Sequence, residues 1–328
     1  MTKIHTLTFS KGVKKLKRSC LVVEKMSAVR LDPHTFLIDL KPGGFSHFIA
    51  SYVIKAERVA IVESGPVVTL PNLLAGLREM NVSTKDVDYV AVSHVHLDHG
   101  GGAAKLLSYL PNAKLVVHRR GAPHIINPER LWTQARQVLG KVAELYEKPV
   151  PVAEERIVAV EEDMVLDLGE GVELLVLETL GHASHHQSLY EKASRGIFPG
   201  DAAGIYIPEF DVTIPTTPPP LHLEAALASI EKLEQLKPEV IYYSHFGKAS
   251  NALEKLKTHA SQLKLWAEIV TEKMREEATL EEIEGEIERR DPALSKAKGY
   301  LATHPILGRG AITQSIQGFE EYLKTKTP

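Results

Sequence analysis

Alternating apolar and polar positions dominate the first ninety residues of the chain, as in "HTFLIDL" and "ASYVIKAERVAIVESG". A repeat of two is typical of strands that bury one face, so these runs predict short strands joined by turns. The leucine spacing of "LPNLLAGLREM" at residues 70–80 instead predicts an amphipathic helix, and "VDYVAVSH" predicts a buried strand. "AAKLLSYL" and "AKLVVH" then predict a helix and another strand, which together indicate an α/β fold.

The strand pattern returns after the midpoint of the chain. Residues 123–150 have a helical pattern that breaks at "EKPVPVAEE", and short strands resume in "MVLDLGEGVELLVLETLGH". "PTTPPP" at Pro215–Pro220 predicts a rigid extended segment, which the helix "LEAALASIEKLEQL" and the strand "EVIYYSH" follow. We therefore expect two β-rich halves with helices outside.

Beyond residue 250 the pattern is helical throughout. "ALEKLKTHASQLKLWAEIVTEKMREE" predicts a long amphipathic helix, and Thr279 with Glu282 three residues later predicts a capping box. Asp291–Pro292 opens a further helix. The chain thus divides into residues 1–250, an α/β domain, and residues 251–328, a helical extension that either covers the site or forms a homodimer.

Composition and charge narrow the classes of partner. The formal net charge of −3 argues against dominant attraction to nucleic acid or to anionic membranes. One basic run, Lys11–Cys20, is interpreted as a solvated strand end or loop rather than a partner-binding patch. Cys20 is the single cysteine, which excludes an intramolecular disulfide and a cysteine-rich metal site. With no signal-peptide pattern and no apolar run of membrane-spanning length, we expect a cytoplasmic protein without a membrane partner.

Candidate chemistry is concentrated in "SHVHLDHGGG", at residues 93–102. His94 and His96 are two positions apart, so at an extended strand end both rings project to the same side and can bind one ion. Asp98 and His99 come where the chain turns, and Gly100–Gly102 permit a tight turn there. Two ligands for each of two metal ions would explain this crowding, since two ions about 3.5–4 Å apart are a known catalytic device.

Three later residues follow predicted strands and complete both positions. His182 stands in "GHASHH", Asp201 in "GDAAG" and His245 in "SHFG". We assign His182 to the first ion, His245 to the second, and Asp201 as a bridge between them. Each ion then has three protein side chains, an open catalytic set rather than a closed structural one. Zinc is the expected metal, although His/Asp sites also accept iron and manganese.

This order of motifs resembles the metallo-β-lactamase superfamily, marked by H-x-H-x-D-H, over about residues 20–250. The resemblance implies a four-layer αββα metallo-β-lactamase sandwich with its site at one edge and, in this chain, a C-terminal all-helical extension. It also implies a hydrolase that uses a metal-bridging hydroxide, with Asp98 and Asp201 as candidate proton carriers. In the family an Asp usually orients the metal loop by hydrogen bonds. Glu63 in "IVESG" replaces it here.

Within the family, the ligand set resembles the glyoxalase II-like and lactonase-like branches, which implies an ester, thioester or lactone as small-molecule substrate. True β-lactamases commonly carry Cys at the bridging position, and no cysteine lies near Asp201. His185, His186 and Tyr206 are further candidates for supporting the metals or contacting the substrate. Three alternatives stay open: a mononuclear iron persulfide dioxygenase, an RNA or phosphodiester hydrolase of the same superfamily, and a non-catalytic metal-binding protein.

Overall fold

The structure is a computed structural model that describes residues 28–161 and 163–326. Its first sheet has the strand order β1-β2-β3-β4-β5-β6-β7. Pairing is antiparallel from β1 to β4 and parallel from β4 to β7. The seven strands are β1 (Ala28–Arg30), β2 (Thr35–Asp39), β3 (Ala50–Lys55), β4 (Val59–Val62), β5 (Val87–Ala91), β6 (Lys114–His118) and β7 (Ile157–Val160).

The second sheet has the order β15-β14-β11-β10-β9-β8 and is also mixed, because β11 and β14 pair parallel while the other pairs are antiparallel. Its strands are β8 (Met164–Asp167), β9 (Glu173–Glu178), β10 (Gln187–Glu191), β11 (Gly196–Phe198), β14 (Val240–Tyr243) and β15 (Gly247–Ser250). A separate two-stranded sheet pairs β12 (Ile205–Ile207) with β13 (Val212–Ile214).

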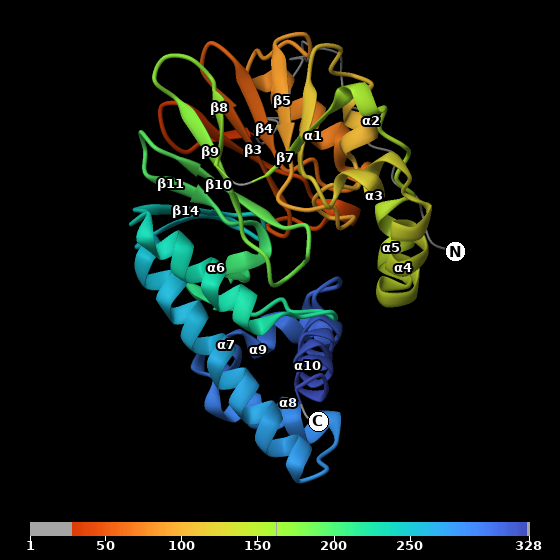
Figure 1. Ribbon diagram of the computed structural model, residues 1–328, viewed down its shortest axis with the longest axis vertical. Coiled ribbons are helices and arrows are strands. Elements are labelled where there is room, and N and C mark those ends of the chain that lie inside the picture. The colour runs from red at the N-terminus through yellow and green to blue at the C-terminus, as the bar shows by residue number, and fades with distance from the viewer. Residues whose placement is uncertain (1–27, 162, 327–328) are drawn as a thin grey trace, which may run out of the picture.

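The two large sheets pack face to face, with helices on their outer sides (Figure 1). Strand β3 shows why its sequence is apolar almost without interruption. Tyr52 and Ile54 point into the core between the sheets, whereas Val53 points into the outer core formed with the helices. A strand buried on both faces loses the clean alternation of a half-buried one. This four-layer arrangement confirms the predicted αββα sandwich.

Helices fill the connections between strands. Helices α1 and α2 pack on the first sheet, and α6 lies along the second. Three short helices, α3, α4 and α5, form an excursion between β6 and β7 (Figure 1). Their bounds are α1 (Leu70–Glu79), α2 (Ala103–Leu107), α3 (Ala122–Ile126), α4 (Glu129–Leu139), α5 (Lys141–Tyr146) and α6 (Leu223–Gln235). Four 3-10 turns, η1 (Pro42–Gly44), η2 (Val67–Thr69), η3 (Glu154–Arg156) and η4 (Gly200–Ala203), complete these connections.

The C-terminal helices predicted from the sequence are present as α7 (Ala252–Arg275), α8 (Leu280–Arg290), α9 (Pro292–Thr303) and α10 (Gly308–Lys324). Thr279 and Glu282 form the expected capping box at α8, and Asp291 caps α9 through the backbone N–H of Ala293. Helix α7 contacts α6 and η4, and α9 contacts β13, so these helices adjoin the sandwich. The division of the chain at residue 250 stays a prediction.

The basic run Lys11–Cys20, and with it Cys20, lies outside the described residues. Among residues 28–161 and 163–326, no helix is both long and apolar enough to cross a membrane.

Candidate metal centre

The loop after β5 carries four candidate ligands to the edge where the two sheets meet. Strand β5 ends at Ala91, and His94, His96, Asp98 and His99 follow in irregular backbone. The backbone N–H groups of Ser64 and Gly65 both donate to the His99 carbonyl at 3.0 Å. The loop after β4 is therefore hydrogen-bonded to the backbone of the ligand loop at His99 itself.

The glycines that end this loop serve a different purpose from the one expected. A Cβ at Gly101 would lie 2.4 Å from the Leu97 carbonyl oxygen, and one at Gly102 would lie 2.7 Å from the Gly65 oxygen. Neither glycine has a positive φ. They are required because the backbone packs against itself too closely for any side chain, rather than because the turn is left-handed.

A first triad consists of His94, His96 and His182, whose ligand atoms converge. His94 Nε2 lies 2.9 Å from His96 Nδ1, and His182 Nε2 lies 3.2 Å from the same His96 atom. His182 reaches this point from the loop after β9. The three side chains supply three imidazole nitrogens to one position.

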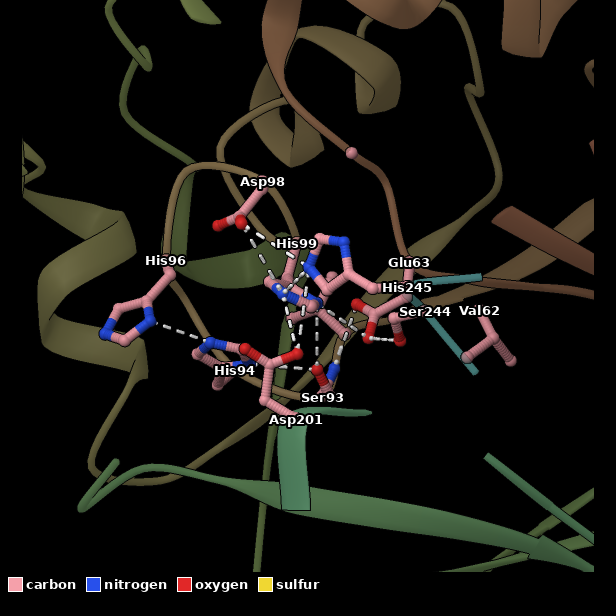
Figure 2. A network of polar contacts seen from close by, with 12 residues as sticks. Val62, Glu63, Ser93, His94, His96, Asp98, His99, Asp201, Ser244 and His245 are labelled. Atoms are coloured by element: carbon pink, nitrogen blue, oxygen red, sulfur yellow. Dashed lines mark hydrogen bonds and ion pairs between the residues drawn. The ribbon is translucent and has the colours of Figure 1, made fainter. Parts of the chain in front are cut away.

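A second triad consists of Asp98, His99 and His245. The Nε2 atoms of His99 and His245 lie 3.3 Å apart, and Asp98 Oδ2 lies 3.8 Å and 3.6 Å from them. Figure 2 shows His245 and His99 facing Asp98 from different segments of the chain. His245 follows β14 in the second sheet, whereas the other two follow β5 in the first.

Asp201 lies between the two triads, in turn η4 after β11. Its Oδ2 is 3.3 Å from His182 Nε2 of the first triad, and its Oδ1 is 3.3 Å from His99 Nε2 of the second. One carboxylate therefore presents one oxygen to each triad. The structure thus brings together all seven residues that the sequence analysis assigned as ligands; their binding of metal stays a prediction.

Backbone carbonyls orient two of the histidines. His182 Nδ1 lies 2.8 Å from the Thr216 carbonyl oxygen, and His245 Nδ1 lies 2.8 Å from that of Phe48. A carbonyl oxygen only accepts, so each Nδ1 carries a proton, and Nε2 is the nitrogen left for a metal ion. The rings are fixed in the tautomer and orientation that metal coordination through Nε2 requires.

Glu63 supports the second triad through His99, and Figure 2 shows it beside Ser244. Its Oε1 accepts from His99 Nδ1 at 3.1 Å and from Ser244 Oγ at 3.0 Å, and its Oε2 accepts from the Ser93 backbone N–H at 3.2 Å. Glu63 is 1% exposed, so these bonds are shielded from water. The longer side chain therefore makes the orienting contacts that the resemblance assigns to an Asp.

Two members of the first triad, His94 and His96, are kept neutral by burial. Burial lowers the pKa of His94 well below its usual value, and the neighbouring His99 and His96 rings lower it further. Burial, with His182 and His185 nearby, lowers the pKa of His96 to about 3. Uncharged imidazoles with lone pairs directed at one point are suited to a metal ion.

The second triad attracts positive charge. Burial opposes protonation of His99, but the charges on Asp201, Glu63 and Asp98 outweigh burial and raise the pKa of His99 well above its usual value. Burial would also raise the pKa of Asp201, yet His99 and His182 hold it well below its usual range. Buried carboxylates of this kind need a compensating cation, which is a proton or a metal ion.

One buried oxygen has room for a further ligand contact. Asp201 Oδ1 is buried, and although it lies 3.3 Å from His99 Nε2, no hydrogen bond of standard geometry reaches it within the described part of the chain. Buried polar atoms are nearly always paired, so this oxygen has capacity for one more contact. An ion between Asp201 and the second triad would supply that contact, and the imidazole and carboxylate donors fit zinc, iron or manganese.

His186 supports Asp201 rather than a metal. The Asp201 backbone N–H donates to His186 Nε2 at 3.1 Å, and His186 Nδ1 lies 2.9 Å from Thr179 Oγ1. Thr179 Oγ1 lies 2.8 Å from Ser188 Oγ, which donates to the Pro199 carbonyl at 3.1 Å. We call this chain of hydrogen bonds, from the Asp201 N–H through the His186, Thr179 and Ser188 side chains to the Pro199 carbonyl, the His186 relay. Because a backbone N–H can only donate and a carbonyl can only accept, the two ends fix the direction of every donor between them. The two end residues flank Gly200 in the sequence.

The other two candidates are placed differently. The His185 ring centroid lies 5.7 Å from that of His96, and the buried His185 Nδ1 has no hydrogen-bond partner among the described residues. The Tyr206 ring stacks on Tyr243, and its hydroxyl donates to Asp211 at 2.8 Å. No described contact joins the Tyr206 side chain to a ligand side chain, so the expected role beside the substrate receives no support.

Sequence reasoning did not identify Tyr146, at the end of α5. This side chain is 2% exposed. Burial raises the pKa of Tyr146 well above its usual value, and the charges of Asp98 and Asp201 raise it further. Tyr146 therefore lies within electrostatic reach of the centre, although no motif marks it.

Comparison with known proteins gives a family match and several relatives. The model of the metallo-beta-lactamase superfamily matches residues 46–245. The metallo-beta-lactamase fold-containing protein ST1585 of Sulfurisphaera tokodaii is 28% identical over 229 residues, which are 68% of this chain and 81% of that protein. Its crystal structure superposes with a TM-score of 0.61 and 26% identity over 71% of this chain and 86% of the other.

Two further structures share the fold at lower identity. The metallo-beta-lactamase family protein TTHA1429 of Thermus thermophilus has a TM-score of 0.67 and 20% identity, covering 90% of this chain and 95% of its own. A B3 metallo-beta-lactamase with an active-site glutamic acid has a TM-score of 0.52 and 15% identity, covering 73% and 89%. These two likenesses concern the fold alone.

Proposed function

The chain belongs to the metallo-beta-lactamase superfamily, and from that premise we propose that it is a metal-dependent hydrolase that holds two divalent ions. Its substrates are small molecules with an ester, thioester or lactone bond. Zinc is the metal that we propose, with iron and manganese as alternatives that the same ligands accept.

The position of Asp201 is the observation that carries this proposal. A mononuclear centre needs one set of ligands, whereas here a single buried carboxylate faces two triads at 3.3 Å each. The His99 side chain is fully buried and that of His245 is 3% exposed. If only the first triad bound metal, nothing would compensate for the burial of these two polar rings beside Asp98. The ligand arrangement therefore favours two ions.

Two bound ions would activate a water molecule as a nucleophile near neutral pH and polarise the bond under attack. Neighbouring residues of the chain hold the ligand side chains in position for that chemistry. Thr216 and Phe48 hold the His182 and His245 rings, Glu63 holds His99, and the His186 relay holds Asp201. The rings and carboxylates then need little rearrangement during the reaction.

Asp98 is the residue that we propose as proton carrier to the leaving group. Its side chain is 23% exposed, while that of Asp201 is 5% exposed and lies behind the ligands. A carboxylate that is both a ligand and open to solvent can take up a proton and release it. Asp201, which lacks that access, is better suited to bridging.

Metal content and substrate specificity test this proposal together. We expect purified protein, dialysed without chelator, to contain two equivalents of zinc, iron or manganese and to release acid from a panel of esters, thioesters and lactones. His96→Ala should abolish hydrolysis, while His34→Ala serves as a control, because His34 lies apart from the centre and bonds the Lys55 carbonyl at 3.0 Å.

Other results would replace the proposal with a named alternative. One equivalent of iron with sulfite formed from persulfides would show a mononuclear dioxygenase. Cleavage of phosphodiesters without ester hydrolysis would show a nuclease. Two bound metals with no activity on any of these panels would show a metal-binding protein without catalysis.

A further inference from the structure

An extended segment lies between His182 and the last helix of the chain. Residues 215–218, which we call the strap, follow β13 and precede α6. The Thr216 carbonyl of this strap accepts the proton of His182 Nδ1 at 2.8 Å. The orientation of the His182 ring therefore depends on the position of the Thr216 carbonyl, which in turn depends on the position of the strap.

Helix α10 holds the strap on both sides of Thr216. Ser315 Oγ donates to the Pro215 carbonyl at 3.1 Å and accepts from the Thr217 N–H at 3.2 Å. Thr217 Oγ1 donates in turn to the Ser315 carbonyl at 3.3 Å. Ser315 and Thr217 are 1% and 3% exposed, so water does not compete for these bonds.

Gly318, one turn further along α10, brings the helix backbone against the same strap. A Cβ at this position would lie 1.8 Å from the Thr217 carbonyl oxygen, a distance that no side chain can adopt. The same helix contains Gly310, where a Cβ would meet nothing within 4 Å. Glycine is therefore required at residue 318 because the helix backbone contacts the strap there, and not because of the helical conformation.

We propose that α10 is a positioning element of the first triad, with Ser315 and Gly318 as its positioning residues. This inference rests on the proposed function, because it assumes that the first triad binds a metal ion. Partners that orient a ligating histidine typically change metal affinity by about 10–100-fold when they are lost. The second triad is independent of the strap, since His245 is held by Phe48 and His99 by Glu63.

The test measures cobalt(II) affinity at each triad separately, by absorption titration in a metal buffer. His245→Ala leaves only the first triad complete, and His96→Ala leaves only the second. We expect Ser315→Ala and Gly318→Ala to weaken binding about tenfold in the first background and less than twofold in the second. Gly310→Ala, the same change on the same helix, should alter neither.

The outcomes separate this inference from the proposed function. If the unaltered protein binds no metal, the proposed function is wrong. If it binds metal but Ser315→Ala leaves both affinities unchanged, or weakens both equally, α10 does not position the first triad. Should Gly318→Ala fail to fold, which circular dichroism would show, Ser315→Ala decides alone because it removes an oxygen and adds no atom.

Discussion

Replacing Glu63 by glutamine tests the electrostatic design of the second triad. The glutamate carboxylate accepts three hydrogen bonds, from His99, Ser244 and the Ser93 N–H, at 3.0–3.2 Å. An amide has the same shape but accepts at only one end, so one orientation sets an NH2 group against the Ser93 N–H. The flipped orientation sets it against the His99 and Ser244 donors.

Either orientation leaves a buried donor unpaired, which costs about 1–3 kcal/mol. The flipped orientation also removes the partner of His99, and the other leaves His99 a neutral amide oxygen in place of a carboxylate. Weakening such an orienting group typically changes metal affinity by about 10–100-fold. We therefore expect Glu63→Gln to weaken the second triad by at least about tenfold and the first triad less. The measurement is zinc binding in chelator-buffered solutions, with metal content determined after equilibrium dialysis.

Glu191→Gln is the matched control for this prediction. Glu191 is also buried, at 5% exposure, and accepts from the Ala193 and Ser194 N–H groups at 2.8 and 2.7 Å, in the turn between β10 and β11. It should lower the free energy of unfolding by a similar amount without changing zinc affinity. If the two variants bound zinc with equal affinity, the predicted role of Glu63 in orienting His99 would be refuted, because any loss of affinity would then follow from lower stability alone.

Three further outcomes follow from the structure. His186→Ala leaves the Asp201 N–H unpaired, so zinc should bind about tenfold more weakly at both triads by the same dialysis assay; an effect on one triad alone would contradict the bridging role. Burial lowers the pKa of His259 from 6.5 to about 4, so the unfolded chain binds a proton that the folded one excludes, and stability is complete above pH 6.5 and lost as pH falls toward 4. Urea unfolding of chelated protein at pH 7 and pH 5 should therefore show His259→Gln losing about 2 kcal/mol less than the unaltered chain, and equal losses would exclude His259. Thr279→Ala removes the cap of α8 and should cost about 1 kcal/mol by thermal unfolding, with zinc affinity unchanged.

Much of the fold could be predicted because local patterns and tertiary burial agree along the chain. The leucines of α1 and the capping residues of α8 and α9 lie where their spacing placed them. The short pair β12 and β13 was not predicted, since three-residue strands carry no periodic signal. Gly101 and Gly102 were correctly marked as necessary, but the reason is a close backbone approach that no local pattern reveals.

In the candidate centre, too, some features could be predicted from the sequence and others could not. The ligands are His and Asp side chains, four of them closely spaced at residues 94–99 and three directly after predicted strands, so the sequence could indicate all seven. Their supports could not be indicated, because Thr216 and Phe48 act through carbonyl groups that every residue has. Tyr206 was suggested by its proximity to Asp201 in the sequence, and its hydroxyl donates to Asp211 in the structure. Its role beside the substrate stays a prediction.

The relay behind Asp201 has a consequence for proton traffic. A chain of donors can conduct a proton only if each donor reverses afterwards, and the Asp201 N–H and the Pro199 carbonyl cannot reverse. The interior on that side is therefore closed to protons. Under the proposed function, a proton released in the reaction would leave by the open side, past Asp98, which is 23% exposed. Asp98→Asn should therefore slow turnover and increase the solvent isotope effect, because proton transfer then limits the rate more strongly; an unchanged isotope effect would exclude this route.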